Sequence, residues 1–171
     1  MMKKMIVSVT FLSMCVLGFS QGGTQTIPSV DLKTMDGKTI NSSTFSNNGK
    51  PMVINFWATW CKPCVLELSN MAEIYDTWAK ETGVKVIAIS IDDTRSMARV
   101  APFVNGKAWE YEVYIDPNSD FKRAMNVPNV PHTFLIDGSG KIVWQHTSYA
   151  DGDENELYEM IKKLAKGESI K

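Results

Sequence analysis

Two cysteines with two residues between them, Cys61 and Cys64, are the residues whose types and spacing most directly indicate chemistry. They lie in the segment Trp60-Cys61-Lys62-Pro63-Cys64, which follows an apolar run and opens a helix-like run. Cys61 is expected in the first helical turn, where unpaired backbone N–H groups and the helix dipole favour a thiolate. Cys64 lies on the same helical face, close enough to form a disulfide. The pattern therefore indicates a redox site in which Cys61 attacks and Cys64 resolves.

The neighbours of the two cysteines are candidates for contact with a substrate. Pro63 stiffens the first helical turn at little cost, because an N–H at that position has no partner within the helix. Lys62 is expected in water, where its charge helps the Cys61 thiolate modestly. Trp60, like Trp57, is interpreted as part of the packing or rim of the site and not as a cofactor ligand.

Packing, zinc binding and copper binding are the other uses of a cysteine pair. Packing alone does not explain two cysteines at redox spacing. Zinc usually takes four ligands, and the other nitrogen candidates, His132 and His146, are fourteen residues apart. Soft thiolates also bind Cu(I), so a copper-carrying protein is the alternative function. The leading interpretation has no metal and no external cofactor, because the redox group is the Cys61–Cys64 disulfide.

The elements on either side of the motif must position it. Residues 52–57 are apolar except for Asn55, which is typical of a strand buried on both faces. The helix after the motif, ended by Gly83, has Glu67 one residue off its apolar stripe. The stripe consists of Cys64, Leu68, Met71, Tyr75 and Trp78. Residues 84–91 form a second buried strand, parallel to the first through the helix crossover.

The rest of the chain predicts further strands and helices around this unit. Residues 27–45 read as a hairpin that turns at Asp36-Gly37. A helix is expected to start at Asp92-Asp93-Thr94, to be divided at Pro102 and to stop at Asn105-Gly106. A strand at residues 111–115, a short helix at 121–125, strands at 132–136 and 141–146, and a last helix before Gly167 follow. Asp153 with Glu156 reads as the capping box of that last helix.

This order of elements predicts an α/β fold with a mixed central sheet and helices on both faces. The motif then lies at the carboxyl end of a parallel strand, where α/β folds place their sites. Residues 27–171 are expected to form one domain, preceded by a flexible entry at residues 21–26.

The first twenty residues are interpreted as a secretion signal cleaved after Ser20. A retained membrane tether and lipidation at Cys15 are the alternatives, although the apolar run of fifteen residues is shorter than the ~20 needed to span a bilayer. Removing Lys3 and Lys4 with the signal leaves 16 basic and 19 acidic residues, a net charge of -3, which does not favour nucleic acid. Cys61 and Cys64 are then the only thiols.

The ten residues from Asn55 to Cys64, together with Glu67, resemble the ResA/TlpA-type extracytoplasmic branch of the thioredoxin superfamily. The resemblance extends from about Ile27 to Leu164 and includes Val130-Pro131 and the segment at residues 134–138. One departure is Ser69, where that branch often has proline.

The resemblance implies a thioredoxin fold with an N-terminal β-hairpin and a strand-helix insertion before the cis-proline strand. Val130-Pro131 is similar to the family's cis-proline facing the cysteines, with the Val130 backbone free to pair with an extended substrate and Pro131 keeping metals from the thiols. Glu67 would be the base that deprotonates Cys64, whereas the residues alone slightly favour an ordinary exposed acid. His132 is left as a rim or strand residue and His146 as a surface residue.

The resemblance also implies a function: an exported, periplasmic thiol-disulfide oxidoreductase that reduces disulfides in exported proteins. Apocytochromes c are one candidate substrate, and a membrane thiol transporter is the expected electron donor. The protein is expected to act as a monomer. Related copper carriers of this fold have three residues between their cysteines, a spacing that this chain lacks.

Overall fold

The computed structural model describes residues 25–170. Within this range one seven-stranded sheet has the order β2-β1-β5-β4-β3-β6-β7. Its strands are β1 (Asp31–Thr34), β2 (Thr39–Asn41), β3 (Met52–Trp57), β4 (Lys85–Ser90), β5 (Glu112–Ile115), β6 (His132–Ile136) and β7 (Ile142–Thr147). The predicted secretion signal at residues 1–20 lies outside the described residues.

Strand β3 lies in the middle of the sheet. It pairs in parallel with β4 and antiparallel with β6, and all six of its residues are buried. Strand β5 continues the parallel part beside β4, and the hairpin of β1 and β2 attaches to β5 in antiparallel orientation. The predicted mixed sheet is confirmed, and its near-continuous apolar strands are the central ones, as burial on both faces requires.

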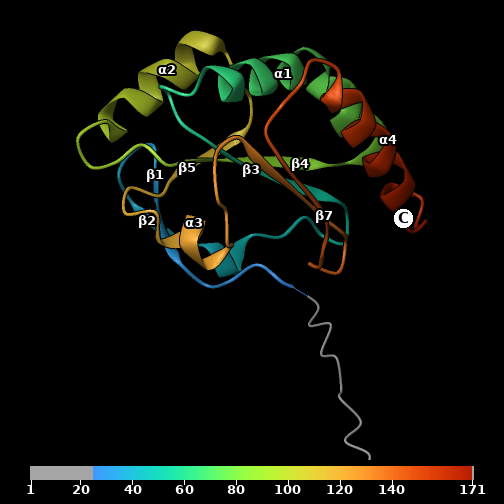
Figure 1. The fold of residues 1–171 in the computed structure, drawn as a ribbon. Coiled ribbons are helices and arrows are strands. Elements are labelled where there is room, and N and C mark those ends of the chain that lie inside the picture. Colours follow the sequence, from blue (N-terminus) through green and yellow to red (C-terminus); the bar gives the residue numbers. More distant parts are fainter. Residues whose placement is uncertain (1–24, 171) are drawn as a thin grey trace, which may run out of the picture.

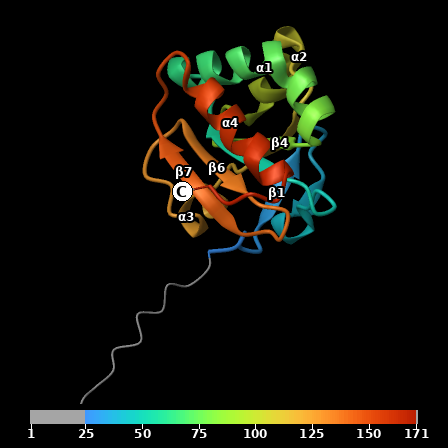
Figure 2. The same cartoon turned by 90° about the vertical axis from the view of Figure 1, so that its right-hand side faces the viewer.

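Helices cover both faces of the sheet, as predicted (Figure 1). The helices α1 (Lys62–Thr82), α2 (Val100–Lys107) and α4 (Asp153–Ala165) lie on one face, and α3 (Asp120–Ala124) lies on the other. Viewed from the side, α4 lies beside α1 over the strands β6 and β7 (Figure 2). The core under α1, α2 and α4 includes both cysteines, whereas Phe121 and Met125 pack in the core on the α3 face.

The helix predicted from Asp92 is wrong at both ends. A short 3₁₀-helix, η2 (Met97–Arg99), leads into α2, so the α-helix begins at Val100. Pro102 then falls in the first turn of α2, where a missing N–H costs little, and it does not divide the helix. The helix ends after Lys107 at Ala108, which has a left-handed φ of 53°. Gly106 lies inside the helix instead of stopping it, because Ala108 takes the conformation that glycine usually supplies.

Two smaller predictions also need correction. Gly152, with φ of 103°, precedes α4, so Asp153 is the first helical residue and no capping box forms. The Asp153 carboxylate instead accepts a hydrogen bond from the Ala150 N–H (2.8 Å). Of the predicted flexible entry, residues 25 and 26 are described and pair with the segment at β7: Ile142 donates to the Gln25 carbonyl (2.9 Å).

A second 3₁₀-helix, η1 (Ser42–Thr44), follows β2.

No helix between residues 25 and 170 combines the length and the apolar character needed to cross a membrane.

Candidate active site

The cysteine pair lies at the junction of β3 and α1. Cys61 is the N-cap of α1, one residue before the first helical residue, and its Sγ accepts a hydrogen bond from the Cys64 N–H (3.4 Å). The two cysteines form a disulfide with their Cα atoms 5.3 Å apart. Their spacing on one helical turn permits this bond without moving the backbone. The structure therefore shows the oxidised state of the motif.

The two sulfur atoms differ in access to solvent. Cys61 is 7% exposed and Cys64 is fully buried. Cys61 is thus the more accessible residue of the pair, as predicted, but it is largely buried and not the openly exposed nucleophile that its position off the apolar stripe suggested. Cys64 is covered because it faces the core with the rest of that stripe.

The residues around the disulfide form an exposed rim. Trp60 is 63% exposed, and Lys62 and Pro63 are also exposed. Lys62 is the first residue of α1 and Pro63 the second. A proline at this position leaves no helical hydrogen bond unmade. By contrast, Trp57 is fully buried in the core at the end of β3, which is the packing role predicted for it.

Val130 and Pro131 come to the same edge of the sheet as the motif. Strand β6 begins directly after Pro131 and pairs with β3 so that His132 lies opposite Phe56, next to the end of β3. The Val130–Pro131 peptide bond is cis. Val130 packs against the core cluster that contains Cys61 and Cys64. This loop therefore reaches the edge of the sheet at which β3 ends and the segment to Cys61 begins.

Glu67 is buried in the core below the motif. Its side chain is 6% exposed, and its Oε1 accepts a hydrogen bond from the Thr133 hydroxyl (2.6 Å). Thr133 in turn accepts a hydrogen bond from the Asn55 amide (2.8 Å). Among the described residues, Oε2 of Glu67 has no hydrogen-bond partner. The reading of Glu67 as an ordinary exposed acid, which the residues alone slightly favoured, is therefore wrong.

Burial raises the pKa of Glu67 from 4.5 to about 7. The hydrogen bond from Thr133 opposes this rise, and the charges of Asp153 and Glu154 add to it. Glu67 follows Cys64 by three residues on α1, so the two side chains lie on neighbouring positions of one helical face. A carboxyl group with a pKa near neutral pH is suited to accept and return a proton.

Sequence reasoning missed three polar residues of the site. Asn55 gave a signal, since it is the one polar residue in an otherwise apolar strand. Thr133 gave no such signal. In a strand that is buried on both faces, the sequence does not show which face a given residue lies on. Asp92 was assigned to a helix start, but it is fully buried after β4 and bonds to Thr59 in the segment that leads to Cys61.

The two histidines lie on β6 and on the edge strand β7. His132 is buried in β6 with Nδ1 2.7 Å from the Thr147 hydroxyl, and burial lowers its pKa. His146 lies on β7 with Nε2 3.6 Å from an oxygen of Asp153. Within residues 25–170, no three histidine, cysteine, aspartate or glutamate side chains come close enough together to hold a metal ion.

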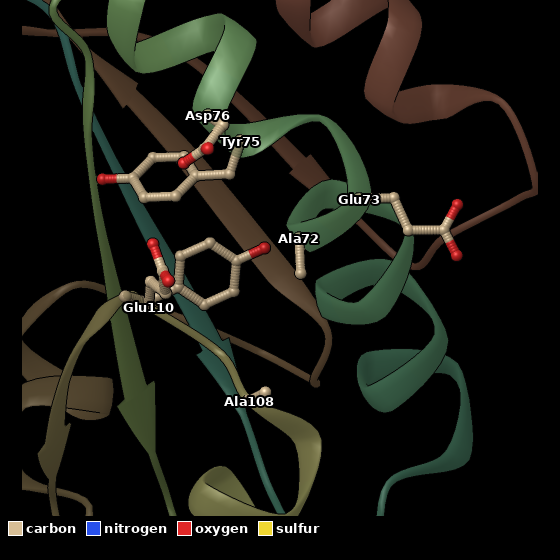
Figure 3. A pocket seen from close by; sticks show the side chains of 7 residues that line it. Ala72, Glu73, Tyr75, Asp76, Ala108 and Glu110 are labelled. Carbon is tan, nitrogen blue, oxygen red and sulfur yellow. The ribbon is translucent and has the colours of Figure 1, made fainter.

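A separate cavity of about 240 Å³ lies further along α1, at Ala72, Tyr75 and Asp76, and faces Glu110 and Tyr111 (Figure 3). Residue 72 is eleven residues from Cys61, roughly 16 Å along a helix. Both tyrosine hydroxyls are bonded within the fold, Tyr111 to the Leu68 carbonyl (2.8 Å) and Tyr75 to the Val86 N–H (3.4 Å). The cavity contains neither cysteine, so the redox site is the rim at the end of β3 and not this hollow.

A mixed sheet, with a disulfide at the start of the helix that follows a buried parallel strand, defines a thioredoxin-like thiol-disulfide oxidoreductase. The chain belongs to the AhpC/TSA family, whose sequence profile matches residues 24–145. The enzyme's redox group is its own cysteine pair, and the family uses no external cofactor for this reaction.

Curated relatives carry the name thiol-disulfide oxidoreductase ResA. The protein of that name from Bacillus thuringiensis subsp. konkukian is 34% identical over 137 residues, which are 80% of this chain and 75% of the relative. The one from Bacillus anthracis is 37% identical over 137 residues, with the same two coverages.

Solved structures share the fold. A thioredoxin-like protein from Porphyromonas gingivalis is 49% identical, with a TM-score of 0.74 over 82% of this chain and 92% of that protein. A thiol:disulfide interchange protein of the thioredoxin family from Chlorobium tepidum is 25% identical, with a TM-score of 0.67 over 84% of this chain and 97% of that protein.

Proposed function

We propose that the protein is an exported reductant of disulfides in extracytoplasmic proteins, with Cys61 as the attacking thiol and Cys64 as the resolving thiol. The observation that carries this proposal is the pairing of a slightly exposed Cys61 with a fully buried Cys64 that has Glu67, with a pKa of about 7, one helical turn away. This arrangement gives the two thiols different tasks.

The reaction begins with the reduced pair. The Cys61 thiolate attacks one sulfur of a substrate disulfide, forms a mixed disulfide and releases the other substrate sulfur as a thiolate. Glu67 then takes the proton of Cys64, whose pKa burial would otherwise keep high. The Cys64 thiolate attacks Cys61, the mixed disulfide breaks, and the second substrate thiolate leaves. Two electrons have passed to the substrate, and the protein is left in the oxidised state that the structure shows.

The rim of the site supports docking of an extended polypeptide. The Val130 backbone pairs with an extended substrate segment as an added strand, which is supported by its position at the edge of the sheet where β3 ends. Trp60, Lys62 and Pro63 surround the disulfide with exposed apolar and basic groups. Pro131 at the start of β6 keeps metal ions from the thiols.

The wider setting belongs to the same proposal. Residues 1–20 direct export and are removed after Ser20, and residues 27–171 act as one monomeric domain in the periplasm. Exported proteins with cysteine pairs, apocytochromes c among them, are the substrates, and a membrane thiol reductant regenerates the Cys61 and Cys64 thiols. The ResA names of the curated relatives support this setting.

The direction of electron flow follows from how strongly the motif stabilises the thiolate. Pro63 offers no side-chain hydrogen bond to a Cys61 thiolate, and the charge of the exposed Lys62 is screened by solvent. We therefore expect a potential near the ~-270 mV of thioredoxin. Equilibration with glutathione measures it, and a value more oxidising than about -180 mV would exclude a reductant.

Substrates are identified by trapping. Cys64→Ala keeps the attacking thiol and removes the resolving one, so mixed disulfides on Cys61 accumulate in cells and can be isolated. The matched control is the double variant Cys61→Ala/Cys64→Ala, which traps nothing. We expect exported proteins with cysteine pairs in the trapped set. A set without them would contradict the proposed function.

A further inference from the structure

Asp92 is a second buried carboxyl group next to the redox motif. It follows β4, which pairs in parallel with β3 so that Ser90 lies beside Trp57. The carboxyl ends of parallel strands meet at the same edge of a sheet, so Asp92 lies beside the segment that leads from β3 to Cys61. The side chain is fully buried, and the mechanism above does not use it.

Three donors converge on the Asp92 carboxylate. Thr59 donates its N–H to Oδ2 (2.8 Å) and its hydroxyl to Oδ1 (2.6 Å), and the Ser90 hydroxyl donates to Oδ2 (2.8 Å). An oxygen pair that only accepts is the pattern of an ionised carboxyl group. Within residues 25–170, no lysine or arginine forms an ion pair with Asp92. The charge is therefore held by dipoles and not by a cation.

Thr59 connects this carboxylate to the redox pair. The Cys61 N–H donates to the Ala58 carbonyl (3.0 Å), which closes a turn over residues 58–61. Thr59 lies inside that turn and is bound to Asp92 at two points. The last residue of the turn is the N-cap of α1. The two bonds to Thr59 therefore fix the conformation of the turn that places Cys61 at the start of α1.

We propose that Asp92, bound to Thr59 in the turn at residues 58–61, keeps a negative charge beside Cys61. A like charge disfavours a thiolate. Because a less stabilised reduced form makes a dithiol a stronger reductant, Asp92 shifts the Cys61–Cys64 couple toward reducing potentials. The inference rests on this pair as the redox group and not on the substrates proposed above.

Other charged groups near the motif are not both buried and hydrogen-bonded to the turn at residues 58–61. Lys62 and the ion pair of Asp93 with Arg95 (3.0 Å) are exposed, where water and salt screen their charges. Glu67 is buried, but it belongs to α1 and bonds to Thr133 instead of the turn.

Three variants of the full chain separate charge from shape. Asp92→Asn removes the charge and keeps the size, Ser90→Ala removes one donor and keeps the charge, and Thr59→Val removes the hydroxyl bond and keeps the charge. We expect Asp92→Asn to change the equilibrium constant with glutathione about tenfold toward the dithiol, which is about 30 mV more oxidising. The midpoint of the pH profile for Cys61 alkylation falls in the same variant. Ser90→Ala and Thr59→Val stay within about twofold of the wild type, with no fall in the midpoint.

The proposal is overturned if Asp92→Asn leaves both the equilibrium constant and the alkylation midpoint unchanged. It is also overturned if Ser90→Ala or Thr59→Val shifts them as far, since loosened structure would then explain the effect. The potential of the wild type tests the proposed reductant function separately, because the inference concerns only the difference between variants.

A measurement on the unaltered protein covers the case in which Asp92→Asn does not fold. Coupling between charges is reciprocal, so the carboxyl carbon of Asp92 in reduced, carbon-13-labelled protein must respond when Cys61 ionises. We expect its chemical shift to inflect at the pH where thiolate absorbance of Cys61 appears. A flat Asp92 shift through that pH overturns the proposal.

Discussion

Glu67 and Asp92 are both carboxyl groups buried beside the redox motif, yet their surroundings differ. Glu67 receives one hydrogen bond at Oε1, from Thr133, and its pKa rises to about 7. Asp92 receives three hydrogen bonds on its two oxygens. Burial penalises both charges, so the number of donors decides what each group can do. The comparison teaches that one buried carboxyl is equipped to exchange a proton, whereas the other binds the turn that leads to Cys61.

The largest expected effect is on stability, from Asp92→Ala. This change leaves the Thr59 N–H and the two hydroxyls without their buried acceptor, so we expect a loss of about 4 kcal/mol in the free energy of unfolding. Urea unfolding of the oxidised protein measures it. Asp93→Ala is the matched control, because the neighbouring Asp93 side chain is only half buried and accepts hydrogen bonds from Arg95 and Ser96 at the surface, so its loss is expected to be smaller. Equal losses would show that Asp92 is not a special acceptor.

Glu67 gives the second largest effect, in the pH dependence of stability. Its pKa is higher in the folded protein (about 7) than its ordinary value of 4.5, so the folded state binds more protons between these pH values. Stability therefore falls as pH rises through this window, by about 3 kcal/mol at about 1.36 kcal/mol per pH unit. Unfolding of wild type and Glu67→Gln from pH 4 to 8 measures the difference. Parallel curves for the two proteins would contradict the raised pKa.

The third effect is on the rate of resolution. Glu67→Gln keeps the shape of the side chain and removes the base for Cys64, so release of a preformed mixed disulfide slows by about tenfold to a hundredfold. Attack by Cys61 changes less. Stopped-flow release of a fluorescent mixed disulfide follows this step, with Glu73→Gln, an exposed acid on the same helix, as control. Unchanged release would leave Glu67 as a buried structural acid.

The smallest effect sharpens the assignment of the two thiols. In the reduced protein at neutral pH, iodoacetamide should label Cys61 about tenfold faster than Cys64, because Cys61 caps the helix and is the less buried of the two residues. Peptide mass spectrometry at partial labelling gives the ratio. Faster labelling of Cys64 would reverse the roles of attacking and resolving thiol.

Local patterns were enough to predict the parts of the site that lie in regular elements. The apolar run at residues 52–57 became β3, and the stripe from Cys64 to Trp78 became the buried face of α1, ended by Gly83 as expected. These features depend on side chains a few residues apart. The mixed sheet with helices on both faces also followed from the alternation of strands and helices.

The rest depends on contacts between distant segments, which a local pattern does not contain. Glu67 lies at the border of its stripe, and only Thr133, 66 residues further on, shows that it faces inward. Asp92 is followed by a second aspartate and a threonine, which imitates a helix start, while its true partner Thr59 lies 33 residues earlier. Ala108 ends α2 with a left-handed backbone conformation, which an alanine in the sequence does not predict.

The central place of β3 also affects which parts of the molecule open first. Proteins unfold locally from their edges, and amide hydrogens in buried central strands exchange last, at the free energy of global unfolding. The turn that carries Cys61 continues directly from β3, which has neighbours on both sides, whereas β2 and β7 form the two edges of the sheet. Transient fraying of those edge strands therefore leaves the cysteine pair in place, so that the redox site persists through partial opening of the fold.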